Sequence, residues 1–165
     1  MIAEANSVRV SRVIRASADR LFDAWTDPQK LMHWWRQTDE GWSFGAASVD
    51  LRVGGRYRLA MRGPDGQLHA AVGEYRQIER PFLLVFTWDW EEATNRLGDT
   101  VVTVEFRDAN GEGTEVLITH ERFLDRLRMG RHEQGWTELL TLLDRAITGL
   151  PDLERKEEHA PRTVS

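Results

Sequence analysis

The apolar residues of this chain recur with two different periods, and this change of period limits the folds that it can adopt. Through much of the chain they occupy alternate positions in short segments, as in Tyr57, Leu59 and Met61. From Trp136 to Ile147 they follow the i, i+3, i+4, i+7 spacing of an amphipathic helix. The first period is typical of strands with one buried face. The sequence therefore predicts an antiparallel sheet covered by a C-terminal helix.

Seven segments are predicted to form strands, and turn signals separate most of them. Gly54-Gly55, Gly63-Pro64-Asp65-Gly66, Arg80-Pro81 and Asn110-Gly111 are typical of turns or strand breaks. The predicted strands are Val8 to Arg15, Ser48 to Val53, the segment of Tyr57 to Met61, His69 to Ile78, Leu84 to Trp90, Val102 to Phe106, and Thr114 to His120.

Two short helices are predicted between the first strand and the second. Ser17 is a suitable N-cap for a helix that contains Leu21, Phe22 and Trp25. Asp27 and Pro28 occupy the capping and first positions of another helix, which carries Leu31, Trp34 and Trp35. In the long C-terminal helix, Glu138, Asp144 and Arg145 are predicted to form the polar face, and Gly149 and Pro151 to end it.

One helix cannot fill the concave side of a strongly curved sheet, so this α+β arrangement predicts a cavity between the two. Residues that share the phase of the buried faces are candidates to line it. They are Trp35, Tyr57, Leu59, Met61, Trp88, Trp90, Ile118, His120, His132, Trp136 and Leu140. The chain contains seven tryptophans but only two tyrosines and six phenylalanines. The indoles could form a solid core or surround a ligand, and both interpretations stay open.

Composition excludes several classes of function. The 165 residues include no cysteine, which excludes disulfides and thiolate metal sites. The net charge is −5 with no basic run, so we expect no nucleic-acid partner. Neither a secretory signal nor an apolar stretch of roughly 20 residues is present, so we expect a cytoplasmic protein without membrane insertion. We expect a monomer or a homodimer.

The chain is expected to fold as one domain with two short extensions. Residues 1–7 form the N-terminal extension, and residues 8–150 form the ligand-binding domain. Residues 151–165 are polar, contain two prolines and lack an apolar period, so we expect a mobile tail.

His120 is the strongest candidate for chemistry, because it shares the phase of Val116 and Ile118. A neutral imidazole there could act as a base, or it could be a core histidine that is hydrogen-bonded to the protein. His132 lies one helical turn before Trp136, but no tight spacing links the two histidines, so we expect no metal. No pair of carboxylates can be placed in the cavity, and we assign no catalytic residue and no cofactor.

Several ordered motifs resemble a known family. They are ASADRLFDAWTDPQKLMHWW, VDLRVGGRYRLAMRGPDG, VGEYRQIERPFLLVFTWDW, GTEVLITHERF and HEQGWTELLTLLDR. From Val8 to Leu150 the chain resembles bacterial single-domain proteins similar to the activator of the ninety-kilodalton heat-shock protein ATPase (AHSA1-like). These belong to the START-like (SRPBCC) superfamily, which includes the birch pollen allergen. The resemblance implies the helix-grip fold, in which a seven-stranded antiparallel sheet wraps around the C-terminal helix.

The resemblance implies a fold and a pocket but little about chemistry, so three functions stay open. The first is binding of a small hydrophobic or aromatic molecule, without chemistry of its own. The second is a cyclase, dehydratase or isomerase that uses His120 in the cavity. The third is a protein-interaction module that modulates a chaperone.

Overall fold

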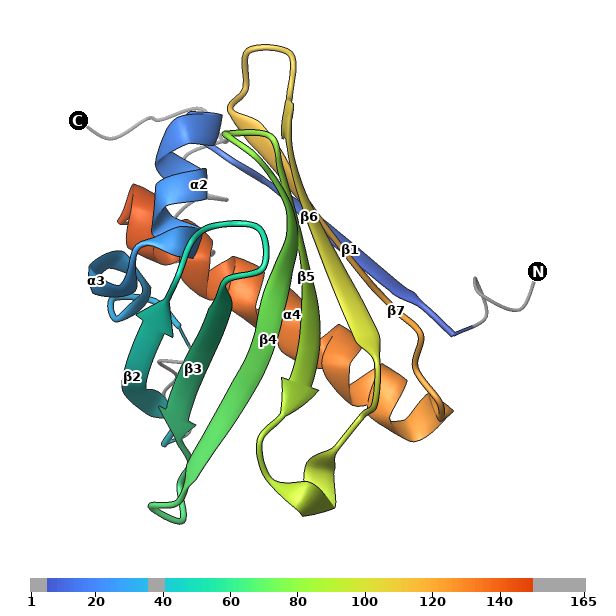
Figure 1. The fold of residues 1–165 in the computed structure, drawn as a ribbon. Helices are drawn as coiled ribbons and strands as arrows, with labels where there is room; N and C mark the ends of the chain where they lie inside the picture. Colours follow the sequence, from blue (N-terminus) through green and yellow to red (C-terminus); the bar gives the residue numbers. More distant parts are fainter. Residues whose placement is uncertain (1–5, 36–40, 150–165) are drawn as a thin grey trace.

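The computed structural model describes residues 6–35 and 41–149, and in it one antiparallel sheet wraps around one long helix (Figure 1). The seven strands lie in the order β1-β7-β6-β5-β4-β3-β2. The strands are β1 (Val8–Ile14), β2 (Ser43–Val49), β3 (Arg56–Arg62), β4 (Leu68–Glu79), β5 (Leu83–Trp90), β6 (Thr100–Asp108) and β7 (Thr114–Glu121). The helices are α2 (Ala18–Thr26), α3 (Pro28–Leu31), the 3-10 turn η1 (Ala93–Asn95) and α4 (Arg126–Thr148).

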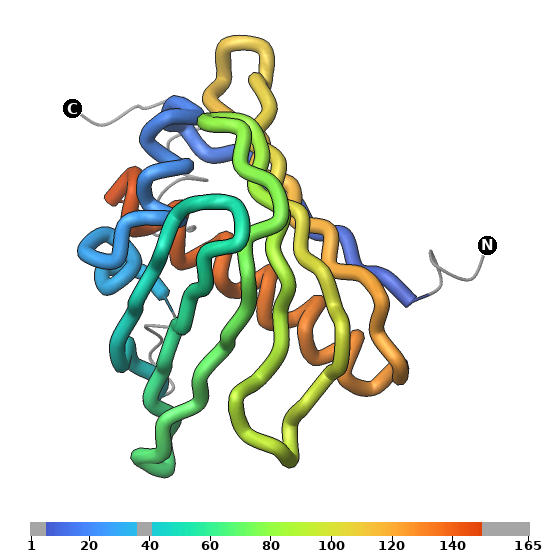
Figure 2. The backbone as a smooth tube through the Cα atoms, viewed as in Figure 1, coloured from blue at the N-terminus to red at the C-terminus, as the bar shows by residue number. Residues whose placement is uncertain are grey.

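The predicted α+β helix-grip fold is confirmed. In Figure 1, α4 crosses the concave side of the sheet diagonally, and α2 and α3 lie beside its C-terminal half. The backbone trace in Figure 2 shows β4 and β5 curving in front of this helix. Because all pairings are antiparallel and mostly join consecutive strands, short turns connect them and β1 closes the sheet against β7. The core forms one continuous cluster between sheet and helices.

Side-chain caps explain why the helices begin where they do. The Ser17 hydroxyl accepts a hydrogen bond from the Arg20 amide, and the Asp27 carboxylate accepts one from the Gln29 amide. Asp125 caps α4 by accepting from the Arg128 amide at 2.8 Å. The helix therefore starts well before the apolar stripe that predicted it, and His132 lies within it.

The prediction of the second strand was wrong in its bounds, since β2 is Ser43–Val49 rather than Ser48 to Val53. The segment after Val49 forms a loop, in which the Gly54 amide donates to the Tyr75 carbonyl oxygen at 2.8 Å. Gly54 has a φ of 87°, which ends the extended conformation. The true strand contains Gly45, Ala46 and Ala47, and such small residues give no alternating pattern.

The placement of Asp144 on the polar face of the C-terminal helix was also wrong. Its side chain is buried, and its Oδ2 atom accepts a hydrogen bond from Arg12 Nε of β1 at 2.8 Å. A buried carboxylate needs such a partner, because its charge loses the stabilisation that water gives it. The helix face that carries Asp144 packs against β1 instead of facing solvent.

Two predictions concern residues at the ends of the chain. The proposed tail, residues 151–165, lies outside the described residues, as does most of the proposed N-terminal extension. Within residues 6–35 and 41–149, no helix combines the length and the apolar composition needed to cross a membrane.

Candidate functional site

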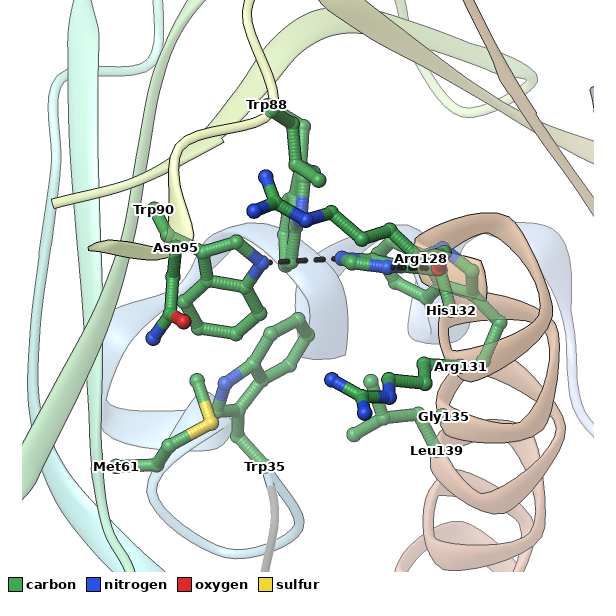
Figure 3. Close-up of a pocket in the computed structure, with 12 residues that line it drawn as sticks. Trp35, Met61, Trp88, Trp90, Asn95, Arg128, Arg131, His132, Gly135 and Leu139 are labelled. Atoms are coloured by element: carbon green, nitrogen blue, oxygen red, sulfur yellow. Dashed lines mark hydrogen bonds between the residues drawn. The ribbon is translucent and has the colours of Figure 1, made fainter. Parts of the chain in front are cut away.

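A pocket of about 200 Å³ lies between the N-terminal half of α4, strand β5 and the loop that follows β5 (Figure 3). Its floor is aromatic, and its polar groups lie towards the helix and the loop. The lining residues are Trp35, Met61, Trp88, Trp90, Asn95, Leu97, Arg128, Arg131, His132, Gly135, Trp136 and Leu139.

Helical geometry brings two rows of α4 side chains to the pocket. Residues four positions apart lie one above the other, so Arg128, His132 and Trp136 form one row. Arg131, Gly135 and Leu139 form the neighbouring row. Gly135 has no side chain, so at this position the helix backbone itself forms the wall of the pocket.

The β5 strand and its following loop form the opposite wall. Alternation along β5 points Trp88 and Trp90 to the same face. The Asp89 carboxylate faces the other way and accepts hydrogen bonds from the backbone amides of Trp90 and Leu97, at 2.8 and 2.7 Å. This carboxylate thus folds the loop back so that Asn95 and Leu97 reach the pocket.

Two tryptophans of the pocket donate their indole N–H groups to histidines. Trp90 Nε1 donates to His132 Nε2 at 3.0 Å, and Figure 3 shows this bond beside the pocket. His132 Nδ1 therefore carries the proton and donates to the Arg128 carbonyl oxygen at 2.8 Å. Trp136 Nε1 donates to His120 Nδ1, also at 3.0 Å. Both imidazoles are held in one neutral tautomer by these bonds.

His120 supports the wall of the pocket without lining it. Its side chain is fully buried, with its ring centroid 4.3 Å from Phe123 and 5.2 Å from His132. Burial lowers the pKa of His120 to about 2, and the neighbouring His132 adds to this shift. An imidazole that is this weakly basic and lies behind the lining residues Trp136 and His132 is poorly suited to abstract a proton from a ligand.

The other two tryptophans of the pocket have no partner for their indole N–H groups. Nε1 of Trp35 and Nε1 of Trp88 are both buried and form no hydrogen bond with any residue that the structure describes. Their side chains are 1% and 3% exposed, so the rings form the floor of the pocket. An unsatisfied buried donor costs about 1–3 kcal/mol. The pocket floor therefore carries two donors that an acceptor on a ligand could satisfy.

Among the residues that the structure describes, the charged groups that line the pocket are positive. Arg128 is engaged by the protein, because its guanidinium donates to the Arg96 carbonyl oxygen and its Nε lies 3.6 Å from Asp125 Oδ2. Arg131 is exposed, and within the described part of the chain its guanidinium has no hydrogen-bond or ion-pair partner. In Figure 3 the Arg131 side chain extends from α4 towards Trp35.

The structure distributes the eleven predicted pocket residues over three places. The pocket itself contains Trp35, Met61, Trp88, Trp90, His132 and Trp136. Tyr57 and Leu59 lie in a second aromatic region, and Ile118, His120 and Leu140 belong to the solid core. Sequence reasoning missed Asn95, Leu97, Arg128, Arg131 and Leu139. The rows Arg128-His132-Trp136 and Arg131-Gly135-Leu139 were visible as i+4 spacing once the helix start at Asp125 was recognised.

The second aromatic region, here called the closed cluster, contains Trp25, Tyr57, Leu59, Tyr75 and Phe86. The space between these residues is about 10 Å³, which holds no more than about one water molecule. The rings of Tyr57, Tyr75 and Phe86 lie within 6.0 Å of one another, measured between centroids. Tyr57 Oη donates to the Thr87 carbonyl oxygen at 2.5 Å.

Metal binding has no support among the residues that the structure describes. No three His, Cys, Asp or Glu side chains in those segments are grouped so that they could hold a metal ion. His120 and His132 are close, but three of their four ring nitrogens are engaged with other atoms.

A family model described as "Activator of Hsp90 ATPase homolog 1-like protein" matches residues 15–148. This match covers most of the chain. The chain belongs to this family. The resemblance noted in the sequence is thereby confirmed, and with it the START-like fold.

Solved structures of bacterial proteins share this architecture. A Chromobacterium violaceum protein is 27% identical, with a TM-score of 0.74 over 85% of this chain and 95% of that chain. The AHSA1 protein of Silicibacter pomeroyi is 26% identical, with a TM-score of 0.74 over 86% and 97%. An AHSA1-like protein of Aeromonas hydrophila, at 22% identity, shares the fold with a TM-score of 0.72 over 96% and 99%. A search of the curated proteins found no match.

Proposed function

We propose that this protein binds a small, flat, largely apolar molecule in the pocket beside α4. The observation that carries the proposal is a space of about 200 Å³ walled by four indole rings, those of Trp35, Trp88, Trp90 and Trp136. Concave sites lined mainly by aromatic side chains with a few polar groups are typical of small-molecule binding. Flat indoles favour flat partners through stacking and burial of apolar area.

The size of the pocket limits the ligand. An apolar cavity of about 150 Å³ can hold benzene. A space of about 200 Å³ therefore suits a compound with one ring and a short substituent, or with two fused rings. This is smaller than the roughly 300–1,000 Å³ that encloses drug-sized ligands. Long-chain lipids and large polycyclic compounds are thus poor candidates.

The enzymatic alternative loses its proposed base, because His120 lies in the core with a strongly lowered pKa. None of the lining side chains that the structure describes is a carboxylate, and His132 uses both ring nitrogens in bonds to Trp90 and the helix backbone. We therefore favour binding without chemistry. The third function, modulation of a chaperone as the family description suggests, stays a prediction.

Filling the pocket from the helix tests the proposal. Gly135→Leu places a side chain in the pocket wall, whereas Gly130→Leu is a matched control, since a Cβ at Gly130 meets no atom within 4 Å. The probe is neutral 2-naphthamide, and isothermal titration calorimetry measures its binding. We expect the natural protein and Gly130→Leu to bind it, and Gly135→Leu to bind roughly tenfold or more weakly.

Thermal unfolding of the same three proteins separates a blocked pocket from a damaged fold. A Gly135→Leu protein that unfolds cooperatively but no longer binds supports the proposal. Unchanged affinity of Gly135→Leu, or no binding by the natural protein, would contradict it.

A further inference from the structure

We infer that the ligand is an organic anion, a flat aromatic carboxylate whose carboxylate pairs with Arg131 while its ring lies among the indoles. The inference rests on the proposed binding function and specifies the chemical class of its ligand. It is carried by three features of the same pocket, namely the sign of its charges, the unpartnered state of Arg131 and the unpartnered donors of its floor.

The charge of the pocket is opposite to that of the chain. The net charge of the chain is −5, yet the twelve lining residues in the described segments 6–35 and 41–149 include two arginines and neither aspartate nor glutamate. A cleft that concentrates positive charge in an otherwise acidic protein attracts anions and disfavours cations. The positive charge of the pocket comes from one helix, because Arg128 and Arg131 occupy adjacent rows of α4.

The two arginines differ in their freedom to bind a ligand. Arg128 connects the helix to the loop after β5 through the Arg96 carbonyl oxygen, so its hydrogen-bonding capacity is partly used. Arg131 keeps its full set of donors, since it has no partner within the described residues. A planar guanidinium with free donors matches the two oxygens of a carboxylate, which can form a bidentate pair with it.

The floor of the pocket also offers hydrogen bonds to a ligand. Trp35 Nε1 and Trp88 Nε1 are buried donors without a hydrogen-bond partner among the residues that the structure describes. The ring of the ligand faces these indoles, and a carbonyl or hydroxyl substituent on that ring would satisfy one of the donors. The pocket therefore offers donors on its floor and cations at its helix wall.

The orientation of the ligand in the pocket follows from the free-energy cost of burying its carboxylate charge. A carboxylate placed on the apolar floor would lose its hydration, whereas one beside the exposed Arg131 keeps part of it. The ring buries its area against Trp35, Trp88 and Trp136, and the charged end stays at the rim. A partly hydrated pair of this kind contributes modestly to affinity but strongly to selectivity between charged and neutral ligands.

The test compares 2-naphthoate with its neutral isostere 2-naphthamide by isothermal titration calorimetry. We expect the natural protein to bind the carboxylate roughly five- to tenfold more tightly than the amide. In Arg131→Gln this preference is lost, so the variant binds the carboxylate and the amide with similar affinities. High salt weakens the preference in the natural protein as well, because ions screen an exposed pair.

Arg126→Gln is the matched control. Arg126 is exposed on the same helix and does not line the pocket, so the variant changes the net charge equally but should keep the preference. A natural protein that binds the amide as tightly as the carboxylate would overturn the inference while the proposed binding function stands. A preference that survives Arg131→Gln would also overturn it. Failure of both compounds to bind would instead contradict the proposed function itself.

Discussion

The two aromatic regions on the concave side of the sheet are built from similar residues but differ in how well they are filled. The closed cluster leaves about 10 Å³ between its side chains, and the pocket leaves about 200 Å³. Trp35 and Trp88 line both spaces, so the regions share a boundary. Aromatic composition by itself therefore does not distinguish a packed core from a binding site.

Backbone geometry explains why the closed cluster packs without space. A Cβ atom at Gly73 of β4 would collide with the Thr87 carbonyl oxygen and with Tyr57, so only glycine allows these groups to approach. Tyr57 then reaches Thr87 across the sheet and donates its hydroxyl hydrogen. On the pocket side, Gly135 of α4 lines the wall of the pocket without a side chain of its own.

The largest expected difference between the regions is the effect of removing one ring. Phe86→Ala creates a cavity in the closed cluster and should lower the free energy of unfolding by about 3–5 kcal/mol. Trp90→Ala should lower it by roughly 1–2 kcal/mol, because Trp90 is only half-buried and already faces the pocket. Urea denaturation of both variants measures the difference, and equal losses would show that the pocket wall is as tightly packed as the core.

Acid should destabilise the pocket side through His120. Burial lowers its pKa in the folded protein to about 2, below the ordinary value of 6.5, so the unfolded chain takes up a proton that the folded chain does not. The stability that the neutral His120 contributes to the folded protein is fully present above pH 6.5 and is lost as the pH falls towards 2. At pH 4.5 the loss is roughly 3 kcal/mol.

Urea denaturation between pH 7 and 4.5 checks the contribution of His120. His120→Gln should flatten the pH dependence, while the exposed His33→Gln should leave it as in the natural protein. An unchanged slope in His120→Gln would assign the acid sensitivity to another group.

Alkali should instead destabilise the closed cluster, which contains both tyrosines of the chain. Burial raises the pKa of Tyr57 well above its usual value, with smaller contributions from Tyr75 and Asp89, and burial raises that of Tyr75 as well. The unfolded chain therefore loses protons first, and each tyrosine removes about 1 kcal/mol of stability by pH 11. Tyrosinate absorbance should appear together with unfolding, and its appearance in the folded protein would contradict the burial.

The smallest expected effects come from two alanine substitutions in α4. Gly130→Ala should raise the unfolding free energy by up to about 1 kcal/mol, because alanine favours helix and the position is unobstructed. Gly135→Ala should give a similar gain but reduce affinity for 2-naphthamide, since its methyl group enters the pocket wall. Chemical denaturation and calorimetry measure both quantities. A Gly135→Ala protein that binds as well as Gly130→Ala would place the ligand away from the helix.

Regular patterns of residues allowed most of the fold to be predicted. The alternation in β3 and β5, the caps at Ser17 and Asp27, and the stripe of α4 all recur as predicted. The bounds of β2 were missed because its small residues show no alternation. The burial of Asp144 was missed because its partner Arg12 is distant in sequence.

The sequence by itself determined the elements and their buried faces, because a strand or a helix with one apolar side must pack that side inward. Only the tertiary structure decided which indoles enclose space, which donate to a histidine and which remain without a partner. Those properties depend on contacts between β5, α4 and the segment around Trp35, which are far apart along the chain and meet only after the sheet has curved around the helix.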